Sequence, residues 1–247
     1  MSISILILMT IVCIFTAGIS AVFGMAGGVI VFLVLSFVVD LPTAIALHAV
    51  IQLISNFSRV IIAFKSIDWR TVFWFSLLLL PMTYLGSLCL KYINEDYLQI
   101  LVGSLIIATI FIPKKTNGTK RKAANWLLVV FGAICSFLSM LVGAIGPLMS
   151  AFLNQTDLQK ENLVSTKAMA QILNHFVKIW MMSQIIAFDF MQYQYEIIIL
   201  ALATIIGSYI GNNVLKKIKD DIYDKLNDLV LFILASIMIG KGSMAFF

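Results

Sequence analysis

Two segments of the chain carry polar side chains at intervals that place them on one face of a helix. The two sets are His48, Gln52, Ser55, Asn56 and Arg59 in the first segment, and Lys167, Gln171, Asn174, His175 and Lys178 in the second. At about 100° per residue, each set falls within an arc of roughly 100°. Each helix therefore presents one polar stripe on an otherwise apolar surface, and at about 1.5 Å per residue the stripe is roughly 16 Å long.

The positive charges on these stripes indicate a site for a small anion. A cation at the depth of a bilayer costs on the order of 2.5–3.5 kcal/mol, and all 12 acidic residues lie in loops or at the ends of apolar segments. A bound anion can supply the missing negative charge, since Arg59 offers a planar guanidinium and Lys178 a point charge. The alternative is that Arg59, Lys167 and Lys178 reach the membrane interface or bond backbone carbonyls.

His48 and His175 are the only histidines of the chain, and both lie on the stripes. A metal site needs three or four ligands with cysteine or acidic partners, which these segments do not provide. Two interpretations stay open. The histidines are hydrogen-bonded packing residues, or one of them accepts a proton during transport, because imidazole titrates near neutral pH.

The composition is that of a protein with several membrane spans. Of the 247 residues, 61% are hydrophobic and only 12% are charged, and the mean hydropathy is +1.03. A soluble protein of this size and composition would lack enough polar surface to stay dispersed in water. The membrane spans also leave no room for a separate soluble domain. The net charge of +5 comes from short loops, so it indicates membrane topology and we expect no nucleic-acid partner.

No motif indicates an enzyme or a cofactor. The glycine cluster 24–28 lacks the lysine and the hydroxyl residue of a P-loop, and no paired acids or nucleophile–base arrangement is present. Cys13, Cys89 and Cys135 lie inside apolar segments without paired spacing, as small buried residues do. We therefore expect no catalytic activity, no cofactor, no disulfide and no metal.

Ten helical segments must position the two stripes. They are predicted at 2–22, 28–39, 43–64, 70–91, 97–112, 125–142, 146–155, 162–187, 195–216 and 226–246. The second and the seventh of these segments are too short to cross a bilayer, and each follows a cluster of glycines. Gly27, Gly28 and Gly146 then open short helices whose N-terminal N–H groups can hold an anion. Close packing through small residues is the alternative.

The two halves of the chain match each other at a constant offset. Residues 119 positions apart pair Gly27 with Gly146, Gln52 with Gln171 and Arg59 with Lys178. Such a run indicates an internal duplication. We assign residues 1–112 to a first transmembrane repeat, 113–124 to a basic cytoplasmic linker and 125–247 to a second transmembrane repeat.

The distribution of basic residues predicts the orientation. Arg59, Lys167 and Lys178 lie within predicted helices. Of the other 14 Lys and Arg residues, only Lys91 and Lys241 fall on the extracellular side, and the remaining twelve fall on the cytoplasmic side. This arrangement places both termini outside and makes the two repeats inverted. Parallel repeats remain the alternative, if each glycine cluster only interrupts one continuous span.

The sequence resembles the TauE/SafE family of sulfite exporters over nearly its whole length. The resemblance rests on the duplication and on the segments Gly24-Met25-Ala26-Gly27-Gly28, Pro42-Thr43-Ala44, Lys65-Ser66-Ile67-Asp68-Trp69 and Leu85-Gly86-Ser87. It implies transport of sulfite, thiosulfate, sulfonates or related small organic anions across the plasma membrane, often outward. The chain departs from the family at Ala26 and at Ala144-Ile145, where glycines are more usual.

We therefore expect an all-α polytopic membrane protein with two inverted repeats of about five helical segments each. A short broken or re-entrant helix lies near the start of each repeat. The expected function is secondary transport of a small anion by alternating access, with the site between segments 43–64 and 162–187 and the two glycine breaks. An anion channel with a continuous polar pore is the alternative. The expected partners are the anion and the lipid bilayer, while proton coupling and a homo-oligomer stay open.

Overall fold

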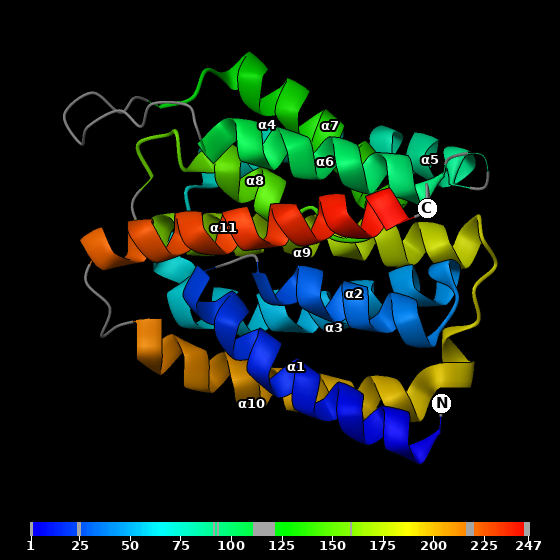
Figure 1. Ribbon diagram of the computed structural model, residues 1–247. Coiled ribbons are helices and arrows are strands. Elements are labelled where there is room, and N and C mark those ends of the chain that lie inside the picture. Colours follow the sequence, from blue (N-terminus) through cyan, green and yellow to red (C-terminus); the bar gives the residue numbers. More distant parts are fainter. Residues whose placement is uncertain are drawn as a thin grey trace.

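The computed structural model describes residues 2–23, 26–90, 92, 94–110, 122–158, 160–215 and 220–244. These residues form helices and contain no strand (Figure 1). The α-helices are α1 (Ile3–Phe23), α2 (Ala26–Val38), α3 (Leu41–Ala63), α4 (Trp69–Ser76), α5 (Leu79–Cys89), α6 (Glu95–Ile110), α7 (Asn125–Val142), α8 (Gly146–Leu153), α9 (Lys160–Gln184), α10 (Gln194–Leu215) and α11 (Asp220–Ser243). Gly24 and most of the predicted linker, residues 113–121, lie outside the described residues.

Two predicted segments differ from the helices that form. The segment 70–91 was predicted as one helix, but it consists of α4 and α5, which meet at an angle of 43°. Pro81 accounts for the break, because it has no N–H to donate to the carbonyl of Leu77 and its ring crowds that turn. The last helix is described from Asp220 onward, six residues before its predicted start at residue 226.

Several helices are suited to a bilayer. Those long and apolar enough to cross one include the spans Ile3–Val22, Leu41–Ile61, Asn125–Val142 and Phe190–Val214, and the bent pair α4 and α5 gives a fifth if it forms one span. Large apolar side chains such as Phe15 and Phe176 are exposed on the outside of the bundle. The protein therefore crosses a membrane several times, with apolar side chains facing the lipid.

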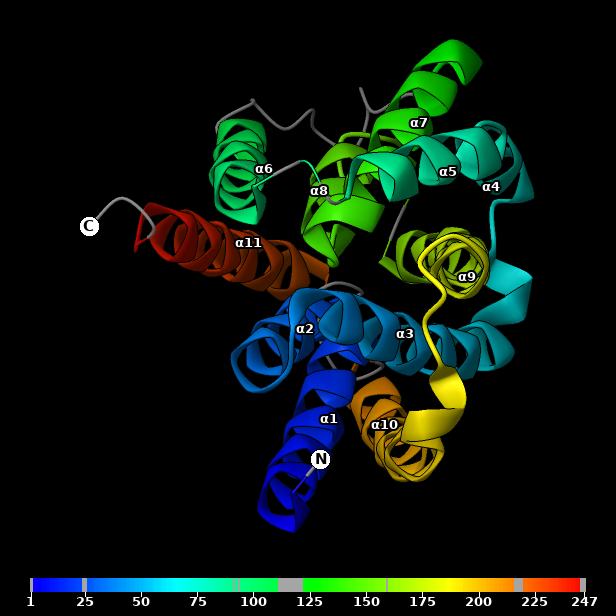
Figure 2. The same cartoon turned by 90° about the vertical axis from the view of Figure 1, so that its right-hand side faces the viewer.

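The two helices that carry the polar stripes, α3 and α9, lie side by side in the middle of the bundle (Figure 2). The rings of His48 and His175 meet near the centre of this pair. Beyond the end of α3, the backbone N–H of Asp68 donates to Oγ1 of Thr166 near the start of α9, at 2.9 Å. Later residues of α3 thus lie beside earlier residues of α9, so the two helices run antiparallel.

The other helices pack around this pair in matching ways. Helix α1 lies along α10 just as α7 lies along α4 and α5, and α6 packs against α11. Glycines make these approaches close: Gly207 and Gly211 of α10 face the backbone of α1, and Gly86 faces the backbone of α7. At these three positions a Cβ would meet the neighbouring helix, which supports the packing interpretation of such glycines.

Candidate functional site

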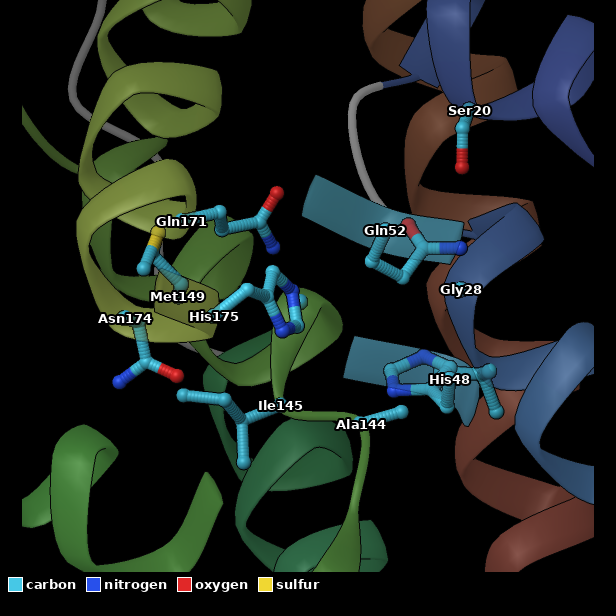
Figure 3. A pocket seen from close by; sticks show the side chains of 12 residues that line it. Ser20, Gly28, His48, Gln52, Ala144, Ile145, Met149, Gln171, Asn174 and His175 are labelled. Atoms are coloured by element: carbon cyan, nitrogen blue, oxygen red, sulfur yellow. The ribbon is translucent and has the colours of Figure 1, made fainter. Parts of the chain in front are cut away.

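A small cavity lies between α2, α3, α8 and α9, at the middle of the bundle (Figure 3). Its lining residues are Ser20, Gly28, Val29, His48, Gln52, Ala144, Ile145, Gly146, Met149, Gln171, Asn174 and His175. The space inside it is about 10 Å³, which is roughly the room that one water molecule needs. Figure 3 shows the side chains of α9 on one side of the cavity and those of α3 on the other.

Both short helices begin at this cavity. Gly28 lies in the first turn of α2 and Gly146 is the first residue of α8, and both line the cavity. Pro147 follows at the start of α8, where a proline has a fixed φ and lacks an N–H that would be unpaired anyway. The positive ends of two helix dipoles therefore lie beside the same space, which favours negative charge there.

Polar atoms around the cavity lack partners among the described residues. They are both ring nitrogens of His48, Nδ1 of His175, Nδ2 of Asn174 and Oγ of Ser20. Asn174 is held in place because its Oδ1 accepts a hydrogen bond from Oγ of Ser139 at 2.6 Å. A buried polar atom without a partner is destabilising by about 1–3 kcal/mol. Such a group of atoms beside one space is typical of a site for a polar ligand.

The three cations of the stripes are buried around the cavity but do not line it. Arg59 is 2% exposed, and Lys167 and Lys178 are 0% exposed. Their positions exclude the interpretation in which these side chains extend to the membrane interface. Lys167 instead donates to Oγ of Ser150 in α8, at 2.8 Å.

Arg59 and Lys178 bond backbone carbonyls, as the second alternative from the sequence predicted, and each acceptor lies at the C-terminal end of a helix. Arg59 Nη1 donates to the carbonyl of Ser20 near the end of α1 at 3.0 Å, and Lys178 Nζ donates to the carbonyl of Gly143 after the end of α7 at 2.8 Å. Gly143 has φ +78°, which a glycine adopts without strain. A helix C-terminus carries partial negative charge. Each cation is therefore partly balanced by a helix end, and neither contacts a carboxylate of the described residues.

A profile of the sulfite exporter TauE/SafE family matches residues 9–238 of the chain. The chain belongs to this family. TauE/SafE proteins are membrane transporters of sulfite or related anions, and that class of function agrees with a buried, positively charged site. No curated protein and no solved structure gives a significant match to the chain.

The structure brings together only part of the site predicted for this TauE/SafE protein. Seven predicted residues line the cavity, namely Gly28, His48, Gln52, Gly146, Gln171, Asn174 and His175. The six others surround it without lining it, namely Gly27, Ser55, Asn56, Arg59, Lys167 and Lys178. The predicted substrate-binding role of all thirteen stays a prediction.

Three of these surrounding residues have evident packing or hydrogen-bonding roles. Gly27 packs against the backbone of Thr16, where a Cβ would overlap the carbonyl. Oγ of Ser55 lies 3.5 Å from Oγ of Ser208 in α10. Asn56 donates to the carbonyl of Gln52 at 2.7 Å and accepts from Arg59 at 2.6 Å.

Five lining residues were not predicted from the sequence, namely Ser20, Val29, Ala144, Ile145 and Met149. One of them had a signal in the sequence. Ser20 and Ser139 are 119 positions apart, so the repeat offset marks both serines: Ser20 lines the cavity, and Ser139 bonds the lining residue Asn174. The apolar members follow only from the way α2 and α8 pack against the stripes.

Proposed function

We propose that this TauE/SafE protein is a secondary carrier of the plasma membrane that binds a small anion in the cavity between α2, α3, α8 and α9. The substrate class is sulfite, thiosulfate, a sulfonate or a related small organic anion. Gln52, Gln171, Asn174 and the two histidines would contact the anion. Arg59, Lys167 and Lys178 would raise the positive potential of the site.

The burial of Arg59 and Lys178 with no carboxylate partner among the described residues carries this proposal. Their hydrogen bonds end on uncharged carbonyl and amide oxygens, and a helix end supplies only about half an elementary charge. A buried charge is tolerated when it is paired. An anion in the cavity, beside two helix N-termini and the unpaired donors, would complete that pairing.

The small size of the cavity supports alternating access. A volume of about 10 Å³ is too small for an anion with three or four heavy atoms, so the helices around it would move to admit one. A carrier whose site is closed between its two open states has this property. The channel alternative needs a continuous polar pore, and no observation on the described residues favours it.

A second hollow supports a route to the site from one end of the α3–α9 pair. It has a volume of about 430 Å³ and is lined by Ile67, Asp68, Lys122, Asp157, Leu158 and Asn162. It lies where α3 ends and α9 begins, which is also the end that holds Arg59 and Lys167. The positive-inside rule assigns this end to the cytoplasm, since Lys65, Arg70 and Lys122 are there.

The packing of the helices supports two inverted repeats. The antiparallel course of α3 and α9 is what an axis in the membrane plane would produce for two corresponding helices. Figure 1 shows the start of α1 and the end of α11 at the same end of the bundle, as the predicted topology requires.

Uptake into proteoliposomes tests the proposal. Wild-type protein is expected to show saturable uptake and counterflow of labelled sulfite or thiosulfate. Gln171→Glu places a carboxylate in the cavity, and two like charges about 5 Å apart repel by roughly 3 kcal/mol at an effective dielectric constant of about 20. We expect its uptake to fall at least about tenfold.

The matched control is Gln184→Glu, the same substitution at an exposed position at the end of α9, which should keep wild-type uptake. Normal uptake by Gln171→Glu would show that the anion does not use this cavity. Flux that does not saturate and shows no counterflow would favour the channel.

A further inference from the structure

The two histidines meet although they do not correspond in the repeat. At the offset of 119 residues, His48 corresponds to Lys167, and His175 corresponds to Asn56. Duplication alone would therefore not have produced a histidine pair. Their ring centroids nevertheless lie 5.6 Å apart with the planes at 74°, on opposite sides of the cavity in Figure 3.

Three of the four ring nitrogens of the pair make no hydrogen bond of good geometry within the described residues. They are both nitrogens of His48 and Nδ1 of His175, and the two side chains are only 1% and 6% exposed. The His48 ring also packs against Phe32 in a T-shaped arrangement, with the ring centroids 5.5 Å apart, and the backbone of Gly28 lies within weak hydrogen-bonding range of it. The packing interpretation of these histidines therefore leaves buried polar atoms unsatisfied.

A metal ion does not explain the pair. No third His, Cys, Asp or Glu of the described residues joins the two rings, and two ligands are too few for a stable zinc site. An imidazole can instead bind and release a proton near neutral pH.

The charges around the pair link a proton to an anion. Lys178 lies within electrostatic range of both rings and Arg59 within range of His175, and none of the described residues that line the cavity carries a carboxylate. Without an anion, a proton on either ring would add another positive charge to a positive site. An anion in the cavity reverses this balance, because it attracts the imidazolium. Binding of either one then favours binding of the other, and by the same factor.

We propose that the His48–His175 pair takes up one proton together with the transported anion, so that the carrier moves both across the membrane. This inference rests on the proposed function. Protonation turns a ring with one donor and one acceptor into a ring with two donors, which suits an oxyanion. The pair takes up only one additional proton, because two adjacent imidazolium rings would repel each other.

Proton uptake by the purified wild-type protein tests the inference directly. The probes are thiosulfate and methanesulfonate, which stay ionised across the assay range, so any proton taken up belongs to the protein. In weak buffer with a pH dye, about one proton should be taken up for each anion bound. Anion binding without proton uptake would overturn the inference and leave the proposed function intact. If neither these anions nor sulfite binds, the proposed function itself fails.

Accumulation in proteoliposomes gives the second test. Methanesulfonate transported together with one proton carries no net charge. When the outside is about one pH unit more acidic than the inside, methanesulfonate should therefore accumulate about tenfold inside the liposomes at equilibrium. An imposed membrane potential should have little effect. In the double variant His48→Gln/His175→Gln the anion moves without a proton. We therefore expect its accumulation to depend on the membrane potential and not on the pH gradient. Wild-type accumulation that follows the potential and ignores the pH gradient would contradict the inference, whatever the variant does.

Discussion

Lys178 separates the energetic role of a buried cation from its functional role. It is fully buried, and the only hydrogen bond described for its ammonium group goes to the carbonyl of Gly143. Taking an ammonium group out of water costs several kcal/mol even after the protein relaxes, and an apolar residue of similar volume avoids that cost. The lost hydrogen bond acts in the opposite direction, by about 1.5–3 kcal/mol. The two effects nearly cancel, so stability and transport can be measured apart.

We therefore predict that Lys178→Met folds with a melting temperature close to that of the wild type, but takes up anion at least about tenfold more slowly. Thermal unfolding in detergent and uptake into proteoliposomes measure the two quantities. A lower melting temperature together with normal uptake would show that Lys178 only fastens the end of α7.

At the residue scale, the polar stripes and their burial could be predicted from the sequence, because spacing on a helix fixes which residues share a face. Which of them reach the cavity could not. An arc of about 100° is wide enough to face two neighbours at once. On α3 it exposes His48 and Gln52 to the cavity, while Ser55 faces α10 and Arg59 reaches back to α1.

At the element scale, adjacent glycines at the start of α2 have different roles. A Cβ on Gly27 would overlap the backbone of α1 at Thr16, which cannot move aside. A Cβ on Gly28 would lie 3.2 Å from the side chain of Gln52, which can shift. Alanine is also favoured over glycine within a helix by about 0.5–1 kcal/mol.

We predict that Gly27→Ala lowers the free energy of unfolding by about 1–3 kcal/mol, whereas Gly28→Ala keeps the wild-type melting temperature. Gly28→Ala should instead weaken anion binding, because Gln52 is displaced and the first turn of α2 is covered. Melting temperatures in detergent and apparent affinities for uptake distinguish the two variants. Equal stability of both would mean that α1 and α2 do not pack as closely as the structure describes.

The sequence predicts most elements because long apolar runs and glycine clusters are strong local signals. It missed the break between α4 and α5 although Pro81 lies in the run, since a proline often only kinks a membrane helix where neighbours re-satisfy the backbone. Helix α9 shows the opposite limit. Its composition is not apolar enough to identify it as a membrane span, because the polar side chains of its stripe face α3 and α8 rather than lipid.

At the scale of the whole molecule, the repeat offset predicted that the two stripe helices belong together, but not what closes the site between them. Beyond α3 and near the start of α9, Oγ of Ser165 donates to the carbonyl of Ser66 at 2.8 Å. The bond from Asp68 to Thr166 lies beside it. These two contacts join the segment after α3 to the start of α9, beside the hollow that Ile67 and Asp68 line.

If this end opens during transport, a covalent link across it should arrest the carrier. We predict that Ser66→Cys/Ser165→Cys, in a background with Cys13, Cys89 and Cys135 replaced by alanine, loses uptake and counterflow by at least about tenfold on oxidation. Reduction should restore both. Each single cysteine variant, treated in the same way, serves as the control. A fully cross-linked protein, verified by mass spectrometry, that still transports at the wild-type rate would place the moving gate elsewhere, since α3 and α9 could not then separate at this end.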